Sequence, residues 1–311
     1  MARYAVVNLF RGLLTLLAVS FIVFMLARLT GDPLDVLAPV DMGPEDEAAL
    51  AAKWGLDGPL PEQYAAFLGN ALRGDFGPSF LFAEETAASV IAERLPRTLQ
   101  LGAAGLVLTL LIGIPLGILS AVKRNSWIDR VAKGLALFGQ SVPEFWLAIM
   151  LIWVFAVQLG WVPTSGRAGF SSIILPAVVT ALFGIAALLR LFRSSMLDTL
   201  STEYVKLARL KGLHKRRVVW KHALKPAAIA PLTFFGRIAV HLLTGATVVE
   251  VVFSWPGIGL LAYESANGRD FPVVQALALL TSAAIVLTNL VTDLLYGYLD
   301  PRVRLGQAGV G

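Results

Sequence analysis

Apolar stretches, each about as long as a helix that crosses a bilayer, alternate with polar segments along this chain. The pattern predicts six transmembrane helices, over residues 9–29, 97–121, 135–159, 172–192, 229–252 and 273–296. We therefore expect an all-α polytopic membrane protein. A small helical external region would lie between the first two spans, and a basic helix pair would lie between the fourth and fifth.

The polar region between the first two spans is acidic and carries two short helical patterns. One begins at Pro44, with three acidic residues that suit a helix N-terminus, and stops at Gly55. The other runs from Pro61 to Gly74, with an apolar face that consists of Tyr64, Phe67, Leu68 and Leu72. We expect residues 31–96 to form a helical cap on the outer side of the membrane.

Composition and charge fit this topology. The 311 residues are 57% hydrophobic and 15% charged, against about 25% charged in soluble domains. The net charge of +5 could suggest nucleic acid, but about 18 of the 26 Lys and Arg fall on one side of the six spans, which indicates cytoplasmic segments and two cytoplasmic termini. The first span resembles a signal peptide in its charged start, yet its length and the lack of a cleavage site favour an uncleaved helix.

The most basic stretch, residues 202–231, predicts a helix, a turn at Gly212 and a second helix. Glycine suits the turn because it adopts positive φ without a Cβ clash. Helical spacing puts apolar residues on each arm. These residues are Tyr204, Leu207, Ala208 and Leu210 on the first arm, and Val218, Val219, His222 and Leu224 on the second. Charge alone would indicate a solvated cytoplasmic loop, whereas the ordered apolar face favours a surface that docks a partner.

Three polar residues within the predicted spans are candidates for a transport pathway, since ionisable groups there are costly. Glu144 could serve a pathway or a helix–helix contact. Arg237 could line the pathway or extend toward the cytoplasmic surface, and His241 favours an interhelical hydrogen bond over a ligand or proton site. Enzyme chemistry is not expected: the chain has no G-x-x-x-x-G-K-[ST] motif, no cysteine and only three scattered histidines, so neither a P-loop, a zinc site nor a nucleophilic triad is credible.

The motif YVKLARLKG at residues 204–212, followed by HAL at 222–224, resembles the EAA loop of permease subunits in binding-protein-dependent ABC importers. More narrowly, it is similar to the dipeptide, oligopeptide and nickel permease family. Lys206 and Leu207 replace a glutamate and an alanine of the general pattern, a departure common in this subfamily. The similarity to this family continues through further segments, in the same order along the chain. It covers GDP at 31–33, GDFG at 74–77, PEFW at 143–146, EVVFSWPGIG at 250–259 and DPRVR at 300–304.

The resemblance implies one half of a permease that pairs with a second, homologous subunit. Two cytoplasmic ATPase subunits would bind ATP and magnesium, and this chain would bind no cofactor. The EAA loop would contact the ATPases. The resemblance assigns this coupling to Glu203, Tyr204, Leu207, Ala208, Arg209, Lys211, Gly212, Leu213, Val218, His222 and Leu224. An external binding protein would deliver substrate to the cap and to the loop at 253–272, where Phe253, Trp255, Pro256 and Gly257 are candidates for an external gate.

This scheme divides the chain into four parts. They are residues 1–30 with the first span, 31–96 as the external cap, 97–299 as the transmembrane core with the coupling loop at 200–226, and 300–311 as a cytoplasmic tail. The implied function is ATP-driven uptake of peptides across the cytoplasmic membrane of a prokaryote. A nickel or other non-peptide importer of the same family is an alternative. An ion-gradient-driven transporter is an alternative of another class, but it should show internal repeats and paired intramembrane carboxylates, and neither is clear here.

Overall fold

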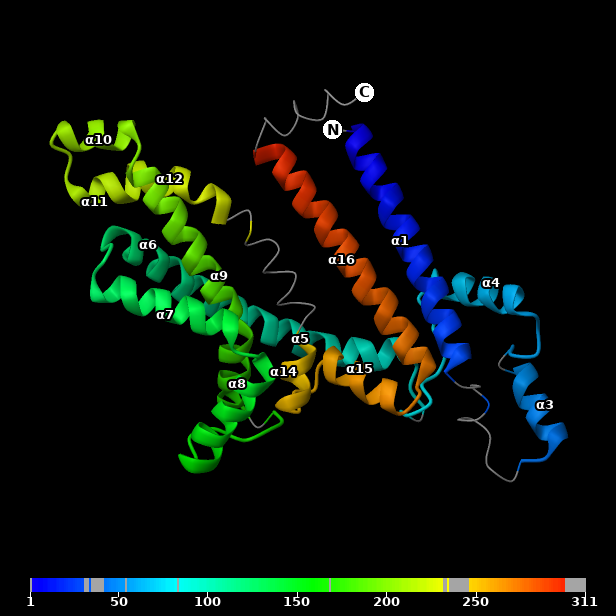
Figure 1. Ribbon diagram of the computed structural model, residues 1–311. Coiled ribbons are helices and arrows are strands. Elements are labelled where there is room, and N and C mark those ends of the chain that lie inside the picture. The colour runs from blue at the N-terminus through cyan, green and yellow to red at the C-terminus, as the bar shows by residue number, and fades with distance from the viewer. Residues whose placement is uncertain are drawn as a thin grey trace. The chain divides into compact units, whose positions relative to one another are not determined.

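The computed structural model describes residues 2–30, 42–53, 55–82, 84–167, 169–231 and 246–299, with residues 34 and 234 (Figure 1). These residues are mostly helical, and their only β-type pairing is an isolated bridge between Pro78 and Thr86. The chain divides into two compact units. Unit 1 comprises Met1–Pro96 and Gly257–Gly311, and unit 2 comprises Arg97–Pro256.

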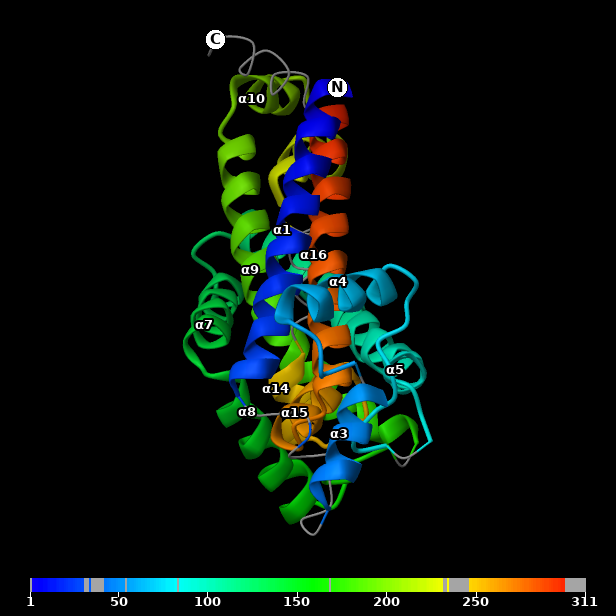
Figure 2. The same ribbon diagram turned by 90° about the vertical axis from the view of Figure 1, so that its right-hand side faces the viewer.

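Unit 1 is built around two long helices, α1 (Ala2–Leu29) and α16 (Phe271–Leu299), which lie side by side in both Figure 1 and Figure 2. Gly12 permits their close approach, because a Cβ at this position would lie 2.5 Å from Val286 Cγ1. The remaining helices of unit 1 are shorter. They are α3 (Pro44–Lys53), α4 (Leu60–Ala71), the beginning of α5 (Ala87–Leu108) and α15 (Ile258–Asn267).

The two short helices expected between the first spans are confirmed as α3 and α4. Gly55 and Gly74, predicted to end them, both have positive φ, +64° and +77°. The predicted apolar face of α4 packs on α1 through Tyr64, whose ring centroid lies 5.5 Å from that of Phe21 and 5.4 Å from that of Phe24. Leu72 is an exception, because its side chain is exposed.

Unit 2 is organised around α9 (Ile174–Leu200), which is buried along most of its length. Before α9 come the end of α5, a π-helical turn η1 (Thr109–Gly113), α6 (Ile114–Val122), α7 (Trp127–Ser141), α8 (Glu144–Leu151), a π-helical segment η2 (Ile152–Gln158) and a 3₁₀ turn η3 (Phe170–Ile173). After it come α10 (Glu203–Leu210), α11 (Lys215–Arg217), a π-helical turn η4 (Val218–Ala223), α12 (Leu224–Ala227) and α14 (Thr247–Val252).

Glycines on two helices allow close packing against α9. A Cβ on Gly117 of α6 would lie 2.7 Å from Phe192 Cβ and 2.8 Å from a backbone oxygen of α9. A Cβ on Gly139 of α7 would lie 2.9 Å from Ala186 Cβ. Small residues at such contacts let helix backbones approach closely, which is how membrane helices gain packing energy without a hydrophobic driving force.

Four helical segments in the described part of the chain are long and apolar enough to cross a membrane: Val7–Leu29, Ala87–Val122, Phe170–Leu200 and Phe271–Leu290. They confirm the predictions over residues 9–29, 97–121, 172–192 and 273–296. The second of them begins earlier than predicted, at Ala87. The predicted span over 229–252 lies mostly outside the described residues.

Over residues 135–159, where the sequence predicts a span, α7 and the segment Glu144–Gln158 are together apolar enough to cross a membrane, but they are not one straight helix. The helix breaks between Ser141 and Glu144, and the two halves meet at 109°. Pro143 explains the break, because the residue before a proline is driven out of the helical region and proline has no amide hydrogen to donate. Val142 accordingly has an extended ψ of 125°.

The predicted external loop at 253–272 contains an unpredicted helix, α15. The loop that follows it is fixed by the buried carboxylate of Asp270. The Ser79 hydroxyl and the backbone amides of Leu81 (3.2 Å) and Val273 (3.4 Å) donate to this carboxylate. Because Val273 belongs to the first turn of α16, Asp270 also caps that helix.

Candidate functional site

The candidate site is the segment that follows α9, from α10 to α12, which we call the docking pair (Figure 1). Only Ser201 and Thr202 separate α9 from α10. Gly212 has a φ of +74°, which confirms the predicted glycine turn. The amide of Gly212 donates to Arg209 O at 3.0 Å, and the amide of Leu213 donates to Ala208 O at 3.4 Å, so the turn closes the C-terminus of α10.

One face of the docking pair packs internally. Val205 and Ala208 of α10 are buried against Val218, and Leu200 and Leu213 cover this cluster partly. The sequence pattern groups Ala208 with Tyr204, Leu207 and Leu210 on the first arm and does not single out Val205. The structure separates these residues, because positions 205 and 208 share one helical face while 204 and 207 share the next.

The opposite face of α10 is apolar and exposed. The exposed fractions of Tyr204, Leu207 and Leu210 are 47%, 53% and 85%, and Trp220 of η4 is also exposed. On the second arm Val218 is buried, whereas Val219, His222 and Leu224 are half-buried. Grouped apolar side chains at a protein surface mark sites of contact with another molecule.

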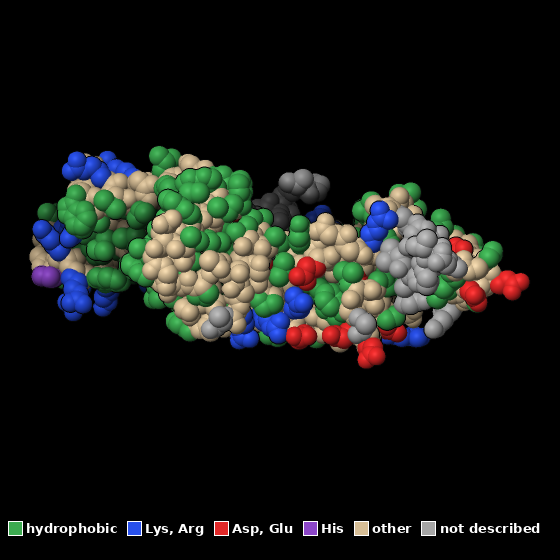
Figure 3. Space-filling view, turned by 90° about the horizontal axis from the view of Figure 1, so that it is seen from below, with side chains coloured by type: hydrophobic (Ala, Val, Ile, Leu, Met, Phe, Trp, Pro, Cys, Tyr) green, Lys and Arg blue, Asp and Glu red, His purple; other side chains and the backbone are tan. Residues whose placement is uncertain are grey.

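Exposed basic side chains lie in the same segment as this apolar face. Figure 3 shows Lys and Arg gathered at the end of unit 2 that carries α10 and α11. Within this segment Glu203 pairs with Lys206 at 2.8 Å, while Arg209 and Lys211 are exposed. An apolar centre with a charged rim is the usual arrangement of a protein–protein interface.

The candidate pathway residues are less well defined by the structure. Arg237 and His241 lie outside the described residues. Glu144 is half-buried in the first turn of α8, directly after Pro143. A carboxylate there is stabilised by the helix dipole, which favours a role in starting α8 at the break.

The candidate gate residues Phe253, Trp255 and Pro256 lie at the end of unit 2, and Gly257 begins the second chain segment of unit 1. Phe253 and Trp255 are buried in the largest apolar cluster of unit 2. The indole Nε1 of Trp255 donates to Arg97 O at 3.0 Å. Pro256 is half-buried, and Gly257 is the N-cap of α15. These contacts give Phe253 and Trp255 a packing role, and a gating role stays a prediction.

Sequence reasoning missed the buried carboxylate of Asp129 in α7. Arg193 of α9 donates to both of its oxygens, from Nε to Oδ1 at 2.7 Å and from Nη2 to Oδ2 at 3.2 Å. Lys133 lies 3.0 Å from Oδ2, and the Ser120 hydroxyl donates to Oδ1 at 2.6 Å. This Asp129 cluster joins α6, α7 and α9 just before the docking pair. A single acid within a strongly basic turn was the signal available in the sequence.

A second buried carboxylate, Glu250 of α14, accepts a hydrogen bond from the Thr98 hydroxyl at 2.6 Å. Glu250 is fully buried and Thr98 nearly so. The bond ties α14 to α5 within unit 2. Glu250 was recognised as the first residue of a motif, but its partner is 152 positions away and had no sequence signal.

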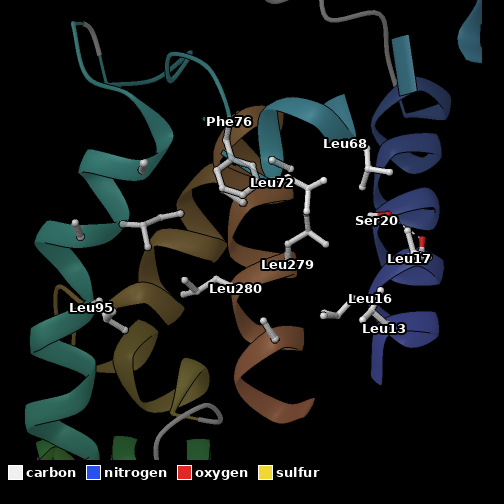
Figure 4. A pocket seen from close by; sticks show the side chains of 16 residues that line it. Leu13, Leu16, Leu17, Ser20, Leu68, Leu72, Phe76, Leu95, Leu279 and Leu280 are labelled. Atoms are coloured by element: carbon white, nitrogen blue, oxygen red, sulfur yellow. Dashed lines mark hydrogen bonds between the residues drawn. The ribbon is translucent and has the colours of Figure 1, made fainter. Parts of the chain in front are cut away.

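Unit 1 contains a cavity of about 670 Å³ between α1, α4, α5 and α16. Figure 4 shows leucines from α1 and α16 facing this space, with Phe76 at one side. Among the described residues that line it, Ser20 is the only polar one, and its hydroxyl contacts Tyr64 Oη at 2.8 Å and Leu17 O at 2.8 Å. Such a lining suits hydrocarbon rather than a polar solute.

Among the described residues no group of three or more His, Asp or Glu could hold a metal ion. The structure is similar to chains of the MetNI methionine ABC transporter in inward-facing conformations. One such comparison has a TM-score of 0.55 at 19% identity and covers 68% of this chain and 96% of that one. A second has a TM-score of 0.51 at 18% identity, with 66% and 95% covered. About two thirds of this chain therefore shares its fold with a chain of that transporter.

The chain belongs to the family of binding-protein-dependent transport system inner membrane components, whose profile matches residues 113–305. The oligopeptide transport system permease protein AppB of Bacillus subtilis is 36% identical, with 98% of this chain and 100% of that protein covered. The glutathione transport system permease protein GsiC of Escherichia coli K12 is 40% identical, with 98% and 99% covered. A Brucella suis protein, named as a candidate peptide permease, is 41% identical, with 98% and 100% covered. The chain is thus a permease subunit of a binding-protein-dependent ABC importer.

Proposed function

We propose that this subunit takes up peptides and that ATPase subunits drive it by binding the docking pair. The observation that carries the coupling is the exposed apolar face of Tyr204, Leu207 and Leu210 on a well-formed helix. This face lies opposite a packed inner face, so a partner that binds it moves the whole pair. Since two residues link α10 to α9, the motion passes directly into the most deeply buried span of unit 2.

Coupling requires contacts that differ between two states of the importer. A ligand shifts a conformational equilibrium only by its difference in affinity for the two conformations. On this proposal, ATP and magnesium close a dimer of ATPase subunits, and the docking pair moves with them. Apolar contacts at Leu207 and its neighbours then matter more than the exposed charges, because surface ion pairs contribute little.

The assembly we propose has a second homologous permease subunit, two cytoplasmic ATPase subunits and an external binding protein. The basic docking pair and both termini face the cytoplasm, as the positive-inside distribution favours. Residues 31–96 form the external cap that receives the binding protein. In this arrangement Arg237, His241 and Glu144 remain candidates for the pathway, and residues 253–257 for the external gate.

Peptide transport rests on the names of relatives that cover nearly the whole chain. The test is uptake of radiolabelled di- and tripeptides by membrane vesicles that contain the complete importer and its external binding protein. Uptake that needs ATP and saturates with peptide supports the proposal. Uptake of nickel without peptide uptake would assign another substrate.

Coupling is tested in the same vesicles with Leu207→Asp, which buries a charge in the proposed apolar interface. We expect loss of most uptake and of ATPase co-purification, while the protein still inserts. Lys206→Gln on the same helix is the matched control and should retain uptake, since its exposed pair with Glu203 contributes about 0.5 kcal/mol or less. Normal uptake by Leu207→Asp would refute coupling through this face.

Gly212→Val tests the turn rather than the interface. No atom lies within 4 Å of the position where its Cβ would be built, so space is available. The backbone, however, has a φ of +74°, which a β-branched residue adopts only with strain. We expect weaker ATPase binding with normal insertion, and Gly134→Val in α7 serves as the control at a glycine without positive φ.

A further inference from the structure

Unit 2 contains a cavity of about 380 Å³ between α7 and α9, separate from the apolar cavity of unit 1. No step of the proposed coupling uses it. Its lining includes Lys133, Leu137, Gln140, Leu189, Arg190 and Arg193. All of these residues belong to the same compact unit. No acidic residue is among those that line it.

The cavity has an excess of positive charge. Arg193 and Lys133 share the carboxylate of Asp129, which is fully buried behind them. Arg190 contacts a neutral partner, with Nη1 donating to Gln140 Oε1 at 2.8 Å. Three cations therefore face one carboxylate. Because a guanidinium carries five N–H donors, Arg190 retains donors for an anion.

The surface beside these cations is apolar. Leu137, which lines the cavity, has an exposed fraction of 71%, and Val131 and Phe138 of the same helix are exposed as well. A small soluble anion would satisfy the cations but would leave these side chains uncovered. A ligand that joins an anionic group to a hydrocarbon chain would satisfy both parts.

We propose that this cavity binds the phosphate headgroup of an anionic phospholipid, with an acyl chain along the exposed face of α7. Arginine binds phosphate in a bidentate geometry, and basic pockets between transmembrane helices bind anionic headgroups. The ligand lies against α9 at the level of the Asp129 cluster. Lipid binding at this place stabilises the contact between α7 and α9, independently of which solute the importer carries.

The test is photocrosslinking of the purified importer complex with photoreactive phosphatidylglycerol, compared with phosphatidylcholine of the same acyl chains. We expect phosphatidylglycerol to label peptides from α7 and α9, and phosphatidylcholine to label them several-fold less. Arg190→Gln should weaken this labelling about fivefold, since one basic residue near an anionic surface contributes about 1 kcal/mol. Arg130→Gln removes the same charge from an exposed position of α7 outside the cavity and should change little.

Three results would overturn the proposal. Equal labelling by the two lipids in the unaltered complex would exclude headgroup recognition, and this comparison needs no variant to fold. Loss of labelling when millimolar inorganic phosphate is present during irradiation would assign the cavity to a soluble anion. Loss of labelling in the presence of the transported peptide would assign the cavity to the transport pathway.

Discussion

Helices α9 and α1 are equally suited to cross a membrane by length and composition, yet they differ in their surroundings. Within its most apolar window, 72% of the α9 residues are buried, against 17% of those of α1. In unit 2, α9 is packed by α6, α7 and the docking pair. In unit 1, α1 packs along α16 and α4 and exposes the rest of its surface, which lipid or another subunit can cover.

The difference shows that hydropathy identifies a span but not its neighbours. Lipid is as apolar as leucine, so burial among helices depends on small residues and polar pairs. Around α9 the structure provides both, with Gly117 and Gly139 at the close contacts and the Asp129 cluster at one end. Four substitutions, in order of decreasing expected effect, test this contrast.

The largest effect is expected for Asp129→Ala, which leaves Arg193 and Lys133 without their carboxylate. Removal of one partner of a buried pair costs about 3–5 kcal/mol, and we expect roughly 3 kcal/mol because both cations are partly exposed. The measurement is the free energy of unfolding in detergent micelles. Asp198→Ala, at an exposed position of α9, is the control. Equal free energies of unfolding for the two variants would show that the Asp129 cluster does not stabilise the packing of α9.

Truncation of a leucine compares the two helices directly. Leu188 of α9 is fully buried, whereas Leu14 of α1 is mostly exposed. We expect Leu188→Ala to lower the free energy of unfolding by about 2 kcal/mol and Leu14→Ala by much less, since the cost follows the cavity left behind. Similar losses at both positions would mean that α1 has protein neighbours comparable to those of α9.

A methyl group tests the close contact of α6 with α9. Gly117→Ala places a Cβ 2.7 Å from Phe192 Cβ, and overpacking of this kind costs about 1–3 kcal/mol. Gly134→Ala in α7 meets no atom within 4 Å and should be neutral or slightly stabilising, because alanine favours the helix. Thermal unfolding of the two variants checks this, and a stable Gly117→Ala protein would contradict the packing described.

The smallest effect concerns the contact of α1 with α4. Tyr64→Phe keeps the ring packing on α1 and removes the hydrogen bond with Ser20, 2.8 Å long. We expect a loss of about 1 kcal/mol in the free energy of unfolding, the usual net contribution of one such bond. Ser20→Ala should lose more, because it also removes the hydrogen bond from Ser20 to Leu17 O, and the double variant should lose no more than Ser20→Ala alone.

Local signals in the sequence predicted much of the fold. The spans followed from apolar length, and α3 and α4 from their proline starts and glycine ends. The turn at Gly212 followed from the conformational freedom of glycine. These features depend on neighbours within a few positions, so a single sequence suffices to predict them.

Features that depend on distant partners were missed. Asp129 and Arg193 are 64 positions apart, and Glu250 and Thr98 are 152 apart, so no spacing rule connects them. Pro143 itself was a local signal for the break, but the long apolar run around it predicted a span over residues 135–159. On α10 the pattern indicated an apolar helix, but only the packing of Val218 and Leu213 decided that Val205 turns inward and Leu207 outward.

The most direct test of the central claim is a site-specific crosslink from the outward face of α10. The chain contains no cysteine, so one introduced thiol gives an unambiguous position. Leu210→Cys and Leu72→Cys place it at equally exposed sites, 85% and 82%, in the docking pair and next to α4. In membranes that contain the complete importer, a thiol-reactive crosslinker should join position 210, and not position 72, to the ATPase subunit. No crosslink from position 210, or equal crosslinking from both, would contradict the account.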